Sequence, residues 1–295
     1  MRREAARVRV AGVAERRFSF ETSEGLPIRG DLALPGEEGA PLVVCLHGFK
    51  GFKDWGFWPG VAARLADAGY GALRFNFSHS GVGEDLEAMS EVALFETGTY
   101  TREVEDLKEI LSRATSRNLP GSERLDVSRI GLIAHSRGSV SALAVAASRE
   151  FPVRSVALWN PVSRVLWWGK EERRLWRERG FWEVVNTRTG QVFRMKTDLL
   201  EDAEKNAGRL DPSENAARIR VPLLAVVAPE DESVPAESGR SLARAAGAFG
   251  SLEEIPGTGH TLGAVHPPRG TTPALERAIS ATLSHFERAL KRETP

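Results

Sequence analysis

Residue types that cooperate in nucleophilic chemistry occur in this chain at the ends of predicted strands. Ser136 lies between the apolar run 129–134 and an alanine-rich helical pattern at 137–149. Its neighbours two positions away, Ala134 and Gly138, are small. A sharp strand-to-helix turn needs small neighbours, and it lifts the serine hydroxyl above the sheet as a nucleophile. The alternative is that Ser136 is a helix N-cap, a position that serine favours.

A serine hydroxyl needs a base that accepts its proton. His260 lies in the glycine-rich stretch "IPGTGHTLG", directly after the last predicted strand. Loops at strand ends commonly present catalytic side chains. His266, which two prolines follow, is the rival base. For His79 and His285 a surface or core role is the better interpretation.

Asp231 is the candidate acid that would orient this histidine and stabilise its charged form. It lies in "VVAPEDESVP", just past an apolar run, and the alternative is a solvated acidic turn. The order Ser136, Asp231, His260 is the order found in hydrolases built on a strand–serine–helix turn. Three weak signals in this order support one another.

Two backbone N–H groups are candidate donors to an oxyanion. One belongs to Arg137, at the start of the helix, and the other to Phe49 in "LHGFKGFKDWGFW". An N–H from the loop after the third strand is expected to join the one that follows the nucleophile. The alternative for the second stretch is a plain glycine turn whose aromatic residues belong to the core.

The elements that must position these residues alternate between strand and helix, which predicts a mostly parallel sheet with helices on both faces. A hairpin is expected at 17–35. Further strands are expected at 41–46, 70–77, 129–134, 153–160, 221–229 and 251–256, and helices at 58–69, 101–116, 137–149, 236–247 and 273–292.

Residues 161–215 interrupt this alternation and are interpreted as an insertion over a core of residues 1–160 and 216–295. The stretch 181–195 resembles two short strands around a turn. Tryptophans are concentrated near the insertion, which suggests that Trp159 and Trp168 bind an apolar or aromatic substrate group. The alternative, which is at least as well supported, is that these rings attach the insertion to the core.

Composition and local patterns argue against nucleic-acid binding, a membrane span, a signal peptide and an internal disulfide. The chain has 295 residues with 40 basic and 40 acidic side chains, so a polyanion such as nucleic acid is not favoured as a partner. No apolar run approaches the roughly 18 residues of a membrane span. The start lacks the apolar core of a signal peptide, and the single Cys45 cannot form an internal disulfide. We therefore expect a cytoplasmic protein, with no membrane partner and with the subunit number left open.

The motifs together resemble the α/β-hydrolase superfamily over about residues 18–290, except for the insertion. The similar stretches are "LHGF", "RFNFSHSGVGED", "AHSRGS", "EDESVP" and "GTGHT", with Ala134 where glycine is usual. The resemblance implies an α/β-hydrolase fold with a small cap between strands six and seven. The cap hairpin is similar to that of feruloyl or cinnamoyl esterases, and the core also resembles acylaminoacyl peptidases.

The resemblance implies a serine hydrolase that cleaves a small-molecule carboxylic ester through an acyl-enzyme on Ser136. It requires no metal or organic cofactor, and no metal-ligand cluster is evident. A peptidase or amidase of the same fold is the alternative, although the large N-terminal propeller of that peptidase group is not evident. A binding protein without activity and a transferase that passes the acyl group to an alcohol are further alternatives.

Overall fold

The computed structural model describes residues 14–83 and 89–291. Most of the amino-terminal stretch, which the sequence predicts not to be a signal peptide, lies outside these residues. Eight strands form the main sheet in the order β1-β2-β4-β3-β5-β6-β9-β10. Their bounds are β1 Ala14–Glu21, β2 Pro27–Leu34, β3 Ala40–Leu46, β4 Gly71–Asn76, β5 Leu125–His135, β6 Val153–Trp159, β9 Leu223–Val227 and β10 Gly250–Glu254.

The sheet is parallel from β4 to β10, whereas β1 and β2 form an antiparallel hairpin at one edge. This confirms the predicted mostly parallel sheet. The helices are α1 Trp58–Asp67, α2 Val92–Glu96, α3 Tyr100–Thr115, α4 Gly138–Ser148, α5 Lys170–Arg179, α6 Asp198–Lys205, α7 Ala207–Leu210, α8 Pro212–Arg218, α9 Glu237–Ala245 and α10 Pro273–Phe286, which a π-helical turn at Glu287–Lys291 extends.

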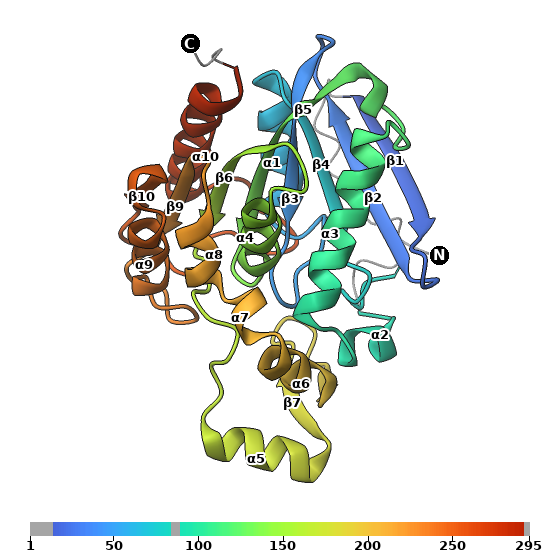
Figure 1. Cartoon of the computed structure of the whole chain (residues 1–295), viewed down its shortest axis with the longest axis vertical. Helices are drawn as coiled ribbons and strands as arrows, with labels where there is room; N and C mark the ends of the chain where they lie inside the picture. Colours follow the sequence, from blue (N-terminus) through green and yellow to red (C-terminus); the bar gives the residue numbers. More distant parts are fainter. Residues whose placement is uncertain (1–13, 84–88, 292–295) are drawn as a thin grey trace.

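Helices cover both faces of the sheet (Figure 1). Side chains of the central strands alternate between the two faces. Leu42 and Val44 of β3 face a core layer with α3, α4, α8 and α9. Val43 and Cys45 face a second layer with α1 and α10. Helices bury both faces of the sheet, so the side chains on both faces of each central strand are apolar. The sequences of these strands are therefore continuous apolar runs.

The segment between β6 and β9 forms a small cap that Figure 1 shows at the lower end of the molecule. It contains α5, α6 and the hairpin of β7 Phe181–Val185 and β8 Val192–Lys196. Helix α8 packs against α4 and α9 of the core. The expected end of the insertion at residue 215 therefore falls inside a core helix, and the chain has already returned to the core at Pro212.

Candidate active site

Ser136 occupies the turn between β5 and α4 with a left-handed backbone, at a φ of 54°. Its N–H donates to the Trp159 carbonyl at the end of β6, at 2.9 Å. A side chain at position 138 would place Cβ 2.7 Å from the carbonyl oxygen of His47 and 2.9 Å from that of Leu46. Only glycine allows α4 to begin this close to β3, which explains the small residue that the sequence shows there.

Ser136 does not cap the helix. The N-cap position is Arg137, and no side chain there accepts a helix N–H. The Ser136 hydroxyl instead lies 3.0 Å from Nε2 of His260, which comes from the loop after β10. The structure thus favours the nucleophile interpretation of Ser136 over the N-cap one.

His260 also contacts the predicted acid. Its Nδ1 lies 2.7 Å from Oδ2 of Asp231, in the turn after β9. The other oxygen, Oδ1, accepts the N–H groups of Ser233 and Val234 at 2.8 and 2.9 Å. Burial raises the pKa of Asp231, but the bonds from His260 and these two N–H groups outweigh it and hold the pKa below its usual value. Asp231 is therefore an anion that fixes the imidazole with Nδ1 protonated.

The loop after β3 approaches the nucleophile from the other side. A Cβ at Gly48 would lie 2.9 Å from the Cβ of Ser136, so the backbone next to Phe49 lies against the serine. Arg137, at the start of α4, has an N–H without an intrahelical carbonyl partner. Both predicted oxyanion donors thus belong to backbone segments that border Ser136.

The side chains of these two residues are also connected. The Arg137 guanidinium lies over the rings of Phe49 and Tyr100, at 5.2 and 4.2 Å from their centroids. Its Nε lies 2.8 Å from the Glu103 carboxylate, and both side chains are largely buried. Sequence reasoning missed this pair because Glu103 lies on the buried face of α3, where nothing local distinguishes it from an exposed helix residue.

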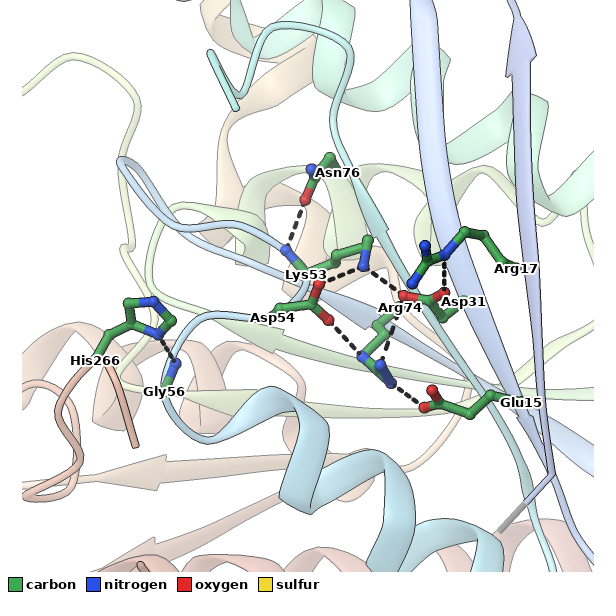
Figure 2. A network of polar contacts seen from close by, with 9 residues as sticks. All are labelled: Glu15, Arg17, Asp31, Lys53, Asp54, Gly56, Arg74, Asn76 and His266. Carbon is green, nitrogen blue, oxygen red and sulfur yellow. Dashed lines mark hydrogen bonds and ion pairs between the residues drawn. The ribbon is translucent and has the colours of Figure 1, made fainter. Parts of the chain in front are cut away.

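A buried network of charges fixes the loop that carries Phe49 (Figure 2). The Lys53 ammonium lies between the carboxylates of Asp31 and Asp54, and Arg74 contacts both at 3.5 and 3.2 Å. The Lys53 backbone N–H donates to the Asn76 side chain at 2.7 Å. Burial raises the pKa of Asp31, but the nearby cations outweigh it and lower the pKa overall. Strands β2 and β4 thus anchor the loop.

His266, the rival base, lies between β10 and α10 and packs against the loop after β3 rather than at the serine. Its Nδ1 accepts the Gly56 N–H at 3.1 Å, as Figure 2 shows. Its ring packs edge-on against Phe52 and stacks near Trp55. His266 therefore supports the loop from the carboxyl-terminal side of the fold.

The two tryptophans predicted to bind substrate lie elsewhere. Trp159 is fully buried in the layer with α1 and α10, where its Nε1–H donates to Thr282 at 3.0 Å. Trp168 packs edge-on against Trp176 and Trp182 within the cap. Trp159 is therefore a residue of the core, and Trp168 contributes to the packing within the cap.

A cavity next to the loop after β3 is lined by core residues and by one cap residue, Met195 of β8. Phe49, Phe95 and Arg137 also line it. The cap reaches this region through Lys50, whose ammonium donates to the Val185 carbonyl at 3.1 Å. The cap hairpin therefore contributes to one side of this cavity.

Two further observations concern the described residues, 14–83 and 89–291. They contain no group of three His, Cys, Asp or Glu side chains arranged to hold a metal ion. No helix among them is long and apolar enough to cross a membrane.

Comparison with solved structures shows the same fold in several hydrolases. A putative hydrolase from Agrobacterium vitis S4 is 18% identical with a TM-score of 0.71, covering 93% of this chain and 99% of its own. Est1E from Butyrivibrio proteoclasticus is 15% identical with a TM-score of 0.64, over 94% and 99% of the two chains. An acylaminoacyl peptidase from Pyrococcus horikoshii is 18% identical with a TM-score of 0.67, over 96% of this chain and 43% of the peptidase.

No curated protein matches the chain in sequence. The family model for the alpha/beta hydrolase family matches residues 43–272, which include the candidate nucleophile, acid and base. The chain therefore belongs to the alpha/beta hydrolase family.

Proposed function

We propose that this hydrolase is a serine esterase that cleaves small-molecule carboxylic esters. The observation that carries the proposal is the continuous chain of contacts from the Ser136 hydroxyl to His260 at 3.0 Å and on to Asp231 at 2.7 Å. A base within hydrogen-bond reach of a hydroxyl, itself oriented by a carboxylate, is the arrangement that activates a serine.

In the proposed mechanism Ser136 Oγ attacks the ester carbonyl while His260 Nε2 accepts the hydroxyl proton. Asp231 stabilises the imidazolium, and the N–H groups of Phe49 and Arg137 bind the oxyanion. His260 then gives its proton to the leaving alcohol, which departs and leaves an acyl group on Ser136. A water molecule, deprotonated by His260, hydrolyses that acyl-enzyme and restores the free serine.

Structural neighbours support esters as the first substrates to test. Est1E has been solved with bound ferulic acid, and another neighbour is an esterase domain from Rhodothermus marinus. The acylaminoacyl peptidase keeps amides as the alternative. This chain matches 43% of that peptidase chain, so the comparison does not include the rest of that enzyme.

The test is hydrolysis of p-nitrophenyl esters from acetate to decanoate, beside the matching p-nitroanilides. We expect ester turnover that Ser136→Ala abolishes. Ser141→Ala is the matched control, because Ser141 is a buried serine on the adjacent helix whose hydroxyl donates to the Gly138 carbonyl within that helix. If the anilides are hydrolysed faster than the esters, the proposed activity is that of an amidase and not that of an esterase. Added alcohols that yield new esters would show acyl transfer instead.

A further inference from the structure

Asn160, the first residue after β6, combines two unusual properties. Its side chain is buried, with 2% of the residue exposed. Its backbone is left-handed, at a φ of 43°, a conformation that asparagine tolerates better than most residues. Strained backbone of this kind persists where the surroundings enforce it, and it is concentrated at functional sites. The proposed mechanism uses neither the backbone nor the amide of Asn160.

The Asn160 amide connects two of the catalytic loops. Its Oδ1 accepts the Ala228 N–H at 2.8 Å, and its Nδ2 donates to the His260 carbonyl at 2.8 Å. The orientation of the amide is unambiguous, because an N–H faces one end and a carbonyl oxygen faces the other. Ala228 in turn accepts the N–H of Asp231 at 3.1 Å, so its position determines where the acid turn begins.

The end of β6 also holds the third catalytic segment. Trp159, next to Asn160, accepts the Ser136 N–H at 2.9 Å. The segments that carry Ser136, Asp231 and His260 are therefore all bonded to two consecutive residues. Because these segments come from three different strand ends, a common attachment point fixes their spacing directly.

His135 supplies a second hydrogen bond to the same carbonyl. Its Nε2 lies 2.9 Å from the His260 oxygen, and the two rings are 4.7 Å apart. Burial lowers the pKa of His135 to about 3, so the ring is neutral and its Nε2 must carry the proton that faces the oxygen. His260 lies in a glycine-rich loop, and two donors from the ends of the neighbouring strands β5 and β6 bind its carbonyl.

We propose that Asn160 is a positioning residue that holds His260 in line with Ser136 and Asp231, with His135 as its second donor. This inference rests on the proposed function and deepens it. Asn160 touches none of the reacting atoms. It acts through the backbone of His260 and through Ala228, so that both contacts of the imidazole form at the same time.

Two variants separate the backbone from the amide. Asn160→Gly keeps the left-handed conformation and removes both side-chain hydrogen bonds. Asn160→Asp retains an acceptor for Ala228 but turns a carboxylate oxygen toward the His260 carbonyl when ionised. Asn215→Ala is the matched control: Asn215 is also buried, and its amide bonds Arg209 and Arg218 away from the triad.

The readouts are kcat and KM for the best ester, the rate at which a fluorophosphonate labels Ser136, and the downfield proton resonance of His260 Nδ1–H. We expect Asn160→Gly to lower kcat and the labelling rate about 10- to 100-fold with KM within about twofold, since misplacing a reacting group by 1 Å costs about this much. The downfield resonance should broaden or vanish. Asn160→Asp should lose more activity as the pH rises and the new carboxyl ionises.

The activity of the double variant Asn160→Gly with His135→Phe should fall by less than the product of the two single-variant losses of activity, because both residues act on one carbonyl.

The inference is overturned if Asn160→Gly loses no more activity and labelling than Asn215→Ala at a matched loss of thermal stability. The resonance is measured without turnover, so an unperturbed resonance in Asn160→Gly overturns the inference even if esters prove not to be substrates. Absence of ester turnover in a wild type that still labels at Ser136 contradicts only the proposed function.

Discussion

At the scale of single residues, the Asp231 carboxylate determines which imidazole nitrogen carries the proton. With Oδ2 at 2.7 Å from Nδ1, it keeps the proton on Nδ1 and leaves Nε2 free to accept from Ser136. The two backbone N–H groups at Oδ1 prevent the carboxylate from rotating away. The turn that follows β9 is thus as important for the tautomer as the carboxylate itself.

Asp231→Asn should reverse this tautomer. An asparagine can still accept the Ser233 and Val234 N–H groups, but its NH₂ then faces Nδ1 and forces the proton onto Nε2. We expect kcat to fall by about 10³- to 10⁴-fold with little change in KM, as known for serine hydrolases with the wrong tautomer. Ester kinetics measure this. Glu232→Gln, at the exposed neighbouring acid, is the control, and a loss of less than tenfold for Asp231→Asn would remove Asp231 from the triad.

Sequence patterns located Ser136, Asp231 and His260 because each follows a recognisable strand and lies in a short motif. They did not locate Asn160 or Glu103, because the partners of these residues lie on other elements and no local spacing marks them. Trp159 shows a different limit. Residue type suggested a binding role, but the alternation along β6 places Trp159 on the same face as Ala157, toward α1 and α10.

At the scale of elements, the approach of α4 to β3 determines where Ser136 and Arg137 lie. The contact has room for no side chain at Gly138, since the nearest atoms are backbone carbonyls that cannot move aside easily. In contrast, Gly60 in α1 is exposed and has no atom within 4 Å of an added Cβ. These two helical glycines form a natural pair for testing the contact.

Gly138→Ala should destabilise the protein by about 2 kcal/mol, the typical cost of forcing extra volume into a packed contact. It should also lower the proposed esterase activity, since the start of the helix carries the Arg137 N–H. Gly60→Ala should be neutral or stabilising by about 0.5 kcal/mol, because it restricts the unfolded chain. Urea unfolding followed by tryptophan fluorescence measures both. Equal stabilities would show that α4 can shift away from β3.

The cap elements were predicted only in part. The hairpin at 181–195 corresponds to β7 and β8, since its turn residues and alternation are local signals. Helices α6, α7 and α8 have 8, 4 and 7 residues, too few for a clear helical period. Packing stabilises them instead: Asp202 of α6 accepts the Thr101 N–H of α3 at 2.9 Å.

At the scale of the whole molecule, the two-sided packing of the sheet buries several histidines as neutral rings. Burial lowers the pKa of His47, His79 and His285 to about 4 and that of His135 to about 3. The unfolded chain protonates these rings near pH 6.5. Between about pH 6.5 and 4 the unfolded state therefore binds more protons at these positions, and stability falls as the pH falls.

Two buried carboxyls act in the opposite direction. Burial raises the pKa of Glu103 to about 7 and that of Asp106 to about 6, in each case against the pull of favourable partners. In the same pH range the folded state binds more protons at these two positions, so acidification favours folding there. Four histidines against two carboxyls leave a net uptake of about two protons on unfolding.

The free energy of unfolding should therefore fall by about 3 kcal/mol per pH unit between pH 6 and 5, which is the linkage slope for about two protons.

Two variants should change this slope in opposite directions. His285→Gln removes one histidine, whose ring bonds the Ser155 hydroxyl at 2.8 Å, and should flatten the slope by about one proton. Glu103→Gln removes an opposing carboxyl and should steepen it by a similar amount. Urea unfolding at pH 5.0, 5.5 and 6.0 measures the three slopes, and parallel lines for all three proteins would show that neither group titrates differently in the folded and unfolded states.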